Sequence, residues 1–180
     1  AETARQQKLL ADIRSRKSSY LARLRALERE SDGISAVLRV AQRNQKAVLA
    51  LPKVRTPLEK PVVIESSFGL RLHPVFLEMK MHTGVDLDGV TGQPVRSAAD
   101  GVVVFADVQD GYGFVVVVDH GDQIATVYAH MSSYSVKVGS TLKKGDVLGL
   151  VGSTGYSTGP HLHFEYRVSG APVDPVPHID

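Results

Sequence analysis

The 180-residue chain contains no cysteine, which excludes disulfide bonds and every metal site built on thiolates. It also has no apolar run approaching the ~20 residues that a membrane-spanning helix needs. The longest strongly apolar run, 114–118, has the length of a buried strand. The chain begins at Ala1, without methionine or a visible signal peptide. We therefore expect a mature or trimmed chain, with no membrane span in this fragment.

The net charge of +2 conceals an uneven distribution. Residues 1–55 contain 13 Lys and Arg against 5 Asp and Glu, whereas residues 56–180 contain 8 against 14. This pattern describes a basic arm on an acidic body, and it fits either a solvated helix face or attraction to a polyanion or an acidic partner. We favour the solvated face and expect no nucleic-acid partner.

The first part of the chain predicts a long helix. Residues 5 to about 50 are rich in strong helix formers, and the first proline is Pro52. An apolar row recurs every seven residues at Ile13, Tyr20, Leu27, Ile34, Ala41 and Val48. Its companion row, at Leu10, Lys17, Leu24, Ser31, Leu38 and Gln45, is apolar at only half of its positions.

This heptad pattern predicts a helical, coiled-coil-like arm over 1–50. It favours one continuous helix over a break at Asp32-Gly33. The apolar stripe needs a partner, which is a second copy of the chain, a removed upstream segment or another protein that pairs with residues 5–50. The alternative is that the stripe packs on the chain's own globular domain.

Three prolines mark a stiff linker over 51–61. Beyond it, β-branched runs alternate with glycine-rich turns, as is typical of an antiparallel all-β domain, here expected over 62–175. The expected strands are 62–65, 94–98, 101–107, 113–119, 123–129, 134–138, 147–151 and 161–168. The tail with Pro172, Pro175 and Pro177, including 176–180, is expected to be extended and peripheral.

Two short stretches carry metal-binding chemistry. His82 and Asp86 are four residues apart, and His161 and His163 are two apart in a strand-like segment, so that both point to one face. Nitrogen and carboxylate ligands suit zinc, and three protein ligands leave a position open for water. Our working assignment is one zinc ion on His82, Asp86 and His163, with His161 free beside it.

A water molecule on such a zinc ion becomes a nucleophile near neutral pH. Hydrolysis of an amide then needs a group that manages protons, and the sequence has no H-E-x-x-H motif to supply a glutamate. His161 and His130 are the candidates for this role. Glu165 could accept a hydrogen bond from a ligand histidine, and His73 could line the cleft. His120 and His178 are interpreted as structural or incidental.

These residues lie in stretches that resemble the lysostaphin-like, LytM-type zinc peptidases of family M23. The stretches are 67–74 (SFGLRLHP), 82–86 (HTGVD), 128–130 (YAH), 152–155 (GSTG) and 161–165 (HLHFE). The resemblance covers residues 62–175 and implies a mainly β, antiparallel two-sheet domain with an open groove. By matching positions, it implies His82, Asp86 and His163 as zinc ligands and His130 and His161 as paired catalytic histidines.

The resemblance also implies an activity, namely cleavage of stem or cross-bridge peptides of peptidoglycan in an extracytoplasmic place: secreted, periplasmic or attached to the cell wall. All five family positions are filled, which favours an endopeptidase. The alternative is a non-catalytic regulator of cell-wall hydrolases that acts through its helical arm. The segment 78–81 should form a loop at the groove edge.

Two further readings are weaker. The segments 136–139 and 143–149 resemble the hairpins of biotinyl and lipoyl carrier domains, but this leaves the histidines unexplained. A zinc cupin could also use His-x-His, but the remaining spacing fits poorly.

Overall fold

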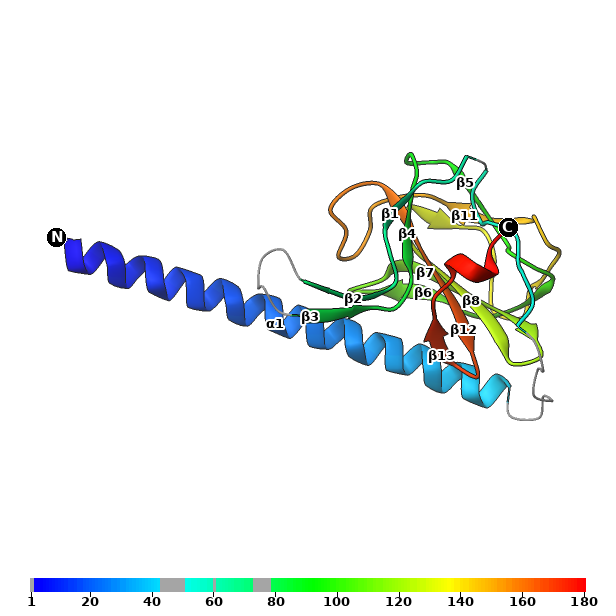
Figure 1. Ribbon diagram of the computed structural model, residues 1–180, viewed down its shortest axis with the longest axis horizontal. Helices are drawn as coiled ribbons and strands as arrows, with labels where there is room; N and C mark the ends of the chain where they lie inside the picture. Colours follow the sequence, from blue (N-terminus) through cyan, green and yellow to red (C-terminus); the bar gives the residue numbers. More distant parts are fainter. Residues whose placement is uncertain (1, 43–50, 60, 73–78) are drawn as a thin grey trace.

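The computed structural model describes residues 2–42, 51–59, 61–72 and 79–180. Figure 1 shows one long helix, α1 (Glu2–Ala41), which runs beneath a β body and projects well beyond it. The helix passes Asp32-Gly33 without a break, as the continuous heptad pattern predicted. The helix was expected to reach about residue 50, but the described helix ends at Ala41, and residues 43–50 lie outside the described residues. Among the described helices, none is both long and apolar enough to cross a membrane.

The strands of the β body are short at the edges and long in the centre. Their bounds are β1 Ile64–Ser66, β2 Gly69–Leu72, β3 Met79–His82, β4 Val85–Asp88, β5 Pro94–Arg96, β6 Gly101–Gln109, β7 Gly113–Gly121, β8 Ile124–Met131, β9 Ser133–Tyr134, β10 Thr141–Leu142, β11 Val147–Leu150, β12 His161–Val168 and β13 Ala171–Val173. The main sheet has eight strands in the order β1-β4-β12-β8-β7-β6-β10, with β13 paired to β12. Two smaller sheets contain β5-β11-β9 and the hairpin β2-β3.

The fold is therefore mainly β and antiparallel, preceded by a long helix, as expected. Three sheets replace the two that the resemblance implied, because the β2-β3 hairpin pairs only with itself among the described strands. The tail is less extended than expected. β13 adds to the main sheet, and a 3₁₀ turn spans Val176–His178. Of the expected strand 134–138, only Tyr134 belongs to a strand, the two-residue β9.

The central strands are buried on both faces. Val116 and Val118 of β7 belong to the core between the sheets, whereas Val115 and Val117 belong to a second apolar cluster that includes residues of α1. Successive residues of a strand point to opposite faces, so the apolar run 114–118 needs a cover on each side of the sheet. The helix is the cover on one of these sides.

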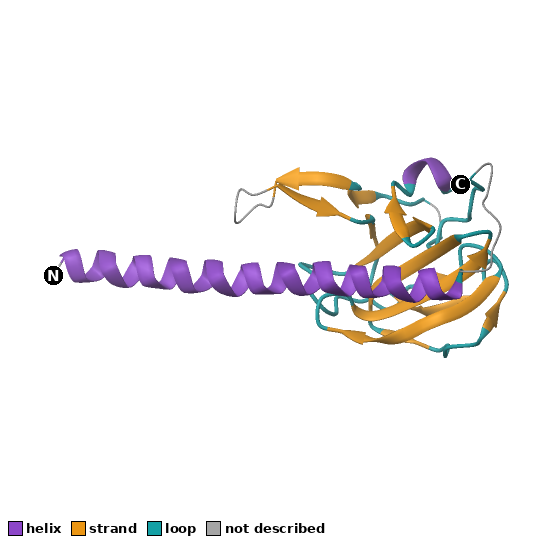
Figure 2. Cartoon of the chain, turned by 90° about the horizontal axis from the view of Figure 1, so that it is seen from below, coloured by secondary structure: helices purple, strands orange, loops and turns teal. Residues whose placement is uncertain are grey.

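The helix packs on its own β body through its C-terminal half. Ile34 and Leu38 are 1% and 0% exposed, and they contact the cluster on β7 and β8. Leu9 and Leu10, nearer the N-terminus, are 60% and 52% exposed. The C-terminal end of the apolar stripe thus packs on the chain's own globular domain, which was the alternative to a separate partner. The N-terminal end is solvated and projects past the β body (Figure 2).

Candidate metal centre and active site

Three strands from two sheets bring the predicted ligands together. His82 ends β3, Asp86 lies in β4, and His163 lies in β12 directly opposite Asp86 in the strand register. Gly84 makes this approach possible, because a Cβ there would lie 2.3 Å from the carbonyl oxygen of Phe164. The glycine of the H-T-G-V-D stretch therefore has a steric role, next to the chemical role of the histidine and the aspartate.

The three ligand atoms form a small triangle. His82 Nε2 lies 3.2 Å from Asp86 Oδ1 and 3.1 Å from His163 Nδ1, and His163 Nδ1 lies 2.9 Å from Asp86 Oδ1. Tetrahedral zinc with bonds of about 2.0–2.1 Å would separate its ligand atoms by roughly 3.3 Å. The observed separations fit such an ion with only slight expansion.

Each ligand histidine uses one ring nitrogen in a hydrogen bond outside the triangle, which leaves its other ring nitrogen available to a metal ion. His82 donates Nδ1–H to the carbonyl oxygen of Ser67 at 2.8 Å, and His163 donates Nε2–H to Glu165 Oε1 at 3.1 Å. The lone pairs of His82 Nε2 and His163 Nδ1 therefore face each other and Asp86. A cation or a proton must stand between such atoms, so this donor set suits a metal ion.

The charges of the cluster are strongly coupled. Burial would raise the pKa of the Asp86 carboxyl, but hydrogen bonds from His163 and His82 hold it well below its usual range. Burial would lower the pKa of His163, but hydrogen bonds to Asp86 and Glu165, with the charges of those carboxylates, raise it to about 9. The two ionised carboxylates thus favour positive charge between the rings.

The two remaining histidines stand next to this triangle. The rings of His130 and His161 are 4.9 Å apart, and His130 lies 5.7 Å from the ring of His163. His161 Nε2 lies 3.7 Å from Asp86 Oδ1. His130 Nδ1 bonds the Thr154 carbonyl and His161 Nδ1 the Gly159 carbonyl, each at 2.8 Å. Each ring therefore presents Nε2 as a hydrogen-bond acceptor.

His130 is held in an unusual backbone conformation. It lies in β8 with φ of 60°, the left-handed region that costs a non-glycine residue free energy. Burial, and then the charges of His163 and His161, lower the pKa of His130 to about 3. The strand is thus bent at the point where this imidazole enters the site, and the ring is neutral at ordinary pH.

A polar row continues along β12 behind the site. His161, His163, Glu165 and Arg167 share one face of the strand, while the alternate residues enter the apolar core. Glu165 accepts the hydrogen bond from His163 that the sequence allowed, and it is 0% exposed. Its other partners, Thr83, Tyr112 and Arg167, were not expected from the sequence.

Two other histidines singled out in the sequence make contacts outside the metal cluster. His120 bonds Thr126 and the Asp100 carbonyl, and His178 stacks on Tyr166 with centroids 4.8 Å apart, so both are structural. His73 lies outside the described residues, as does Glu78 of the expected edge loop. The remaining residues of that loop belong to β3, where Met79 and Met81 are 59% and 48% exposed.

An open depression of about 480 Å³ adjoins the site on the side of His161. It is lined by Glu65, Asp88, Gly89, Val90, Thr91, Thr158, Gly159, Pro160 and His161. On the side of β2, the Arg71 guanidinium lies 3.9 Å from Asp86 Oδ2 and is half exposed. Polar and charged groups at the surface therefore border the metal cluster on these two sides.

The chain is similar in sequence and in structure to known peptidases. The chain is 48% identical over 113 residues to the DD-carboxypeptidase/endopeptidase Mpg of Neisseria meningitidis. The aligned segment covers 63% of this chain and 26% of Mpg. It is 41% identical over 121 residues to the peptidoglycan DD-endopeptidase ShyA of Vibrio cholerae, 67% of this chain and 28% of ShyA. A zinc-containing peptidase from Vibrio cholerae matches in structure with a TM-score of 0.66 and 36% identity, over 69% of this chain and 40% of that one.

The chain spans about a quarter of the length of these two curated relatives. The model of peptidase family M23 matches residues 80–175, which contain His82, Asp86, His130, His161 and His163. The matched segment is more than half of the chain and includes every side chain of the cluster described above. On these grounds the chain belongs to peptidase family M23.

Proposed function

We propose that the chain is a zinc-dependent endopeptidase that hydrolyses peptide bonds in peptidoglycan outside the cytoplasm. The observation that carries the proposal is the convergence of three ligand atoms, each at most 3.2 Å from the others, beside two histidines that are held by backbone carbonyls through Nδ1. The names of Mpg and ShyA support peptide cross-links of the DD type as the bond that is cut.

In this proposal His82, Asp86 and His163 hold one zinc ion. When bound, the ion would act as a Lewis acid and would lower the pKa of a water molecule. Asp86 contributes a negative charge, and the Ser67 carbonyl and Glu165 orient the two ligand rings. The three protein ligands leave one side of the site open to substrate.

His130 and His161 act on the reacting atoms. Each ring is anchored through Nδ1–H to a backbone carbonyl, so that Nε2 can take a proton from the attacking water and, once protonated, donate a hydrogen bond to the developing oxyanion. Once protonated, an imidazolium can return the proton to the leaving amine. Because the two rings are 4.9 Å apart, both can reach one scissile amide.

The test is digestion of purified peptidoglycan from walls with direct D-amino-acid cross-links and from walls with glycine bridges. Fragments are identified by mass spectrometry, with and without a chelator, and with His163→Ala as control. We expect chelator-sensitive fragments from the directly cross-linked wall. Release of no fragment by the zinc-loaded chain from either wall would contradict the proposal and favour the non-catalytic regulator.

A further inference from the structure

A fully buried arginine lies between the metal cluster and α1. The side chain of Arg167 is 0% exposed, and its Nε donates to Glu165 Oε2 at 2.6 Å. Its Nη atoms donate to the hydroxyl and carbonyl oxygens of Ser31 at 2.9 and 3.1 Å, to the Ser35 hydroxyl at 2.8 Å and to the Gly170 carbonyl at 3.2 Å. Two serines of α1 therefore complete the hydrogen bonding of a buried cation.

Glu165 connects this cation to the ligand histidine. Oε2 accepts from Arg167, whereas Oε1 accepts from His163 Nε2 at 3.1 Å, from the Tyr112 hydroxyl at 2.8 Å and from the Thr83 hydroxyl at 2.5 Å. Both oxygens are thus held by side chains that are themselves fixed. The orientation of the His163 ring depends on where these partners hold the carboxylate.

A second path from α1 reaches the same carboxylate. The Glu30 carboxylate accepts hydrogen bonds from the backbone N–H groups of Gly111 and Tyr112 at 3.1–3.2 Å. A Cβ on Gly111 would lie 2.4 Å from Leu27 Cδ2, so the turn carries glycine where the helix docks. Glu30 therefore fixes the backbone of Tyr112, whose hydroxyl bonds Glu165.

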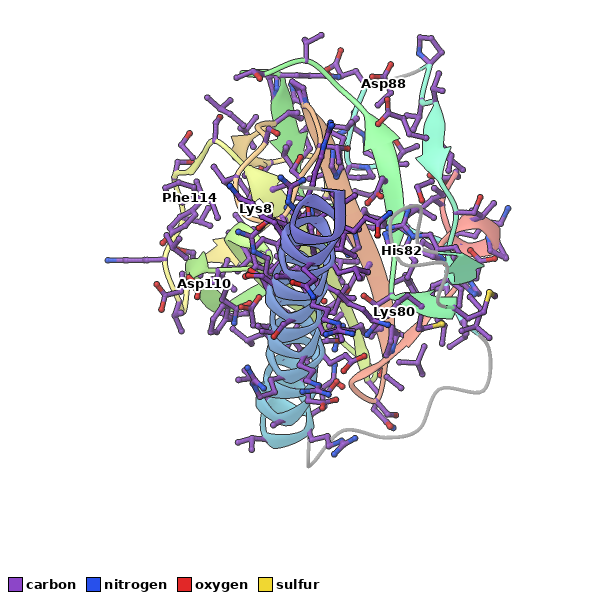
Figure 3. All side chains as sticks on the ribbon, turned by 90° about the vertical axis from the view of Figure 1, so that its left-hand side faces the viewer. Lys8, Lys80, His82, Asp88, Asp110 and Phe114 are labelled. Carbon is purple, nitrogen blue, oxygen red and sulfur yellow. The ribbon has the colours of Figure 1, made fainter. Side chains whose placement is uncertain are left out.

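The position of the helix agrees with this arrangement. Figure 3 looks along α1 from its N-terminal end, with His82 and Lys80 on one side of the helix and Asp110 and Phe114 on the other. Lys80, two residues before His82, pairs with Glu28 of α1 at 2.6 Å. The helix thus contacts β3 through Glu28 and the turn at Gly111 and Tyr112 through Glu30.

We propose that α1 is part of the support of the metal site, and that Ser31, Ser35 and Glu30 are positioning residues for His163. The path runs from the two serines through Arg167, and from Glu30 through Tyr112, to Glu165. This inference rests on the metal site of the proposed function. The helix lies outside the segment matched to family M23. In this inference it nevertheless affects the affinity of the site for its metal.

The physical reason is the cost of an incomplete buried network. Loss of hydrogen bonds to a buried guanidinium leaves donors unpaired, so Arg167 shifts to find partners or water, and Glu165 follows it. Groups that orient a metal ligand typically change metal affinity 10–100-fold when they are removed. A purely structural role of α1 would instead change the stability of the fold and leave the affinity of the folded protein unchanged.

The experiment uses the full chain with the double substitution Ser31→Ala and Ser35→Ala. The control Ser18→Ala and Ser19→Ala removes two exposed hydroxyls of the same helix. A second control, Leu38→Ala, weakens the packing of α1 on the sheet but leaves every side chain of the path unchanged. Zinc affinity is measured by competition with a chromophoric chelator well below the unfolding temperature, and the Co²⁺ form is examined by visible spectroscopy.

We expect the Ser31/Ser35 variant to bind zinc about tenfold more weakly than the unmodified chain and to shift the Co²⁺ absorption bands. The Ser18/Ser19 control should match the unmodified chain, and Leu38→Ala should lose stability with a smaller change in affinity. An unchanged affinity and spectrum, or losses no larger than those of Leu38→Ala, would overturn the inference. Failure of the unmodified chain to bind zinc would instead overturn the proposed function.

Discussion

At the scale of single residues, the site separates groups that would hold the metal from groups that would move protons. The ligand His163 differs from the other histidines of the site in the partner of its second ring nitrogen. The ring of His163 is held by a carboxylate, whereas the rings of His82, His130 and His161 are held by backbone carbonyls. A carboxylate partner makes an imidazole a stronger metal ligand, and a neutral carbonyl leaves it a mild base.

The first prediction follows from this separation. His130→Ala or His161→Ala should lower kcat by on the order of a hundredfold or more, because a general acid–base group contributes 10²–10⁴-fold. Zinc content should stay at one ion per chain, since neither ring belongs to the ligand triangle. Steady-state kinetics and metal analysis check both parts. Unchanged turnover in His130→Ala would remove His130 from the mechanism.

The second prediction concerns pH and the metal-free chain. The pKa of His163 is raised from 6.5 to about 9 by Asp86 and Glu165 against the effect of burial. A raised folded-state pKa stabilises the fold fully below pH 6.5, and this contribution is lost as the pH rises toward 9. We therefore expect the Tm of the metal-free protein to fall between pH 6.5 and pH 9.

The matched variant for this pH profile is Asp86→Asn, which removes one of the two carboxylates beside His163. Its Tm should fall less steeply over the same interval, as measured by thermal unfolding in chelator-treated buffer. If the two profiles were parallel, His163 would not be the group that titrates. Excess zinc should remove the slope in the unmodified chain, because metal binding displaces the proton.

The residues of the cluster were predictable, whereas their supports were not. His82, Asp86, His130, His161 and His163 lie in short stretches of recognisable spacing, and the structure brings all five together. Arg167 and Tyr112 had no such signal, because an arginine in a strand ordinarily faces solvent. The one available cue was the alternation of β12, which places Arg167 on the face of the two histidines.

At the scale of elements, the sequence predicted the long strands and the short strands β1, β5 and β11, but it missed the other short strands. The strands expected at 101–107, 113–119, 123–129 and 161–168 correspond to β6, β7, β8 and β12. β2, β3, β4, β10 and β13 were missed, because runs of two to four residues give little periodicity. The sequence also left open that the C-terminal part of α1 packs on the chain's own sheet, because a heptad stripe has the same pattern whether it packs on a helix or a sheet.

The third prediction tests the packing of α1. Leu38→Ala should lower the free energy of unfolding by about 2–5 kcal/mol, the usual cost of truncating a buried leucine. Leu38 is fully buried on the β sheet, whereas Leu10 is half exposed. Leu10→Ala is therefore the control and should change stability by less than about 0.5 kcal/mol. Urea denaturation of both variants checks the difference, and equal effects would contradict the docked position of the helix.

At the scale of the whole molecule, the helix closes an apolar face of the main sheet. Val115, Val117 and Val127 form part of the cluster under α1. Without the helix these side chains would meet water, and a contiguous exposed apolar patch promotes association. An apolar core thus holds the basic arm on the acidic body, in addition to any attraction between their charges.

The fourth prediction is the behaviour of residues 51–180 without the arm. This fragment should have a lower Tm than the full chain, bind a hydrophobic dye and associate at micromolar concentration. Calorimetry, dye fluorescence and sedimentation measure these properties. A monomeric fragment as stable as the full chain would show that α1 is not needed to cover the sheet.

The row His161, His163, Glu165 and Arg167 has a consequence for the modularity of such proteins. One end of the row faces the metal cluster, and the other end contacts Ser31 and Ser35. The same eight-residue strand, β12, therefore contributes to the metal cluster and to the contact with α1. A chimera that joined this β domain to a foreign helix would need hydroxyl groups at the two matching positions. A buried arginine therefore constrains which helices can be joined to this β domain.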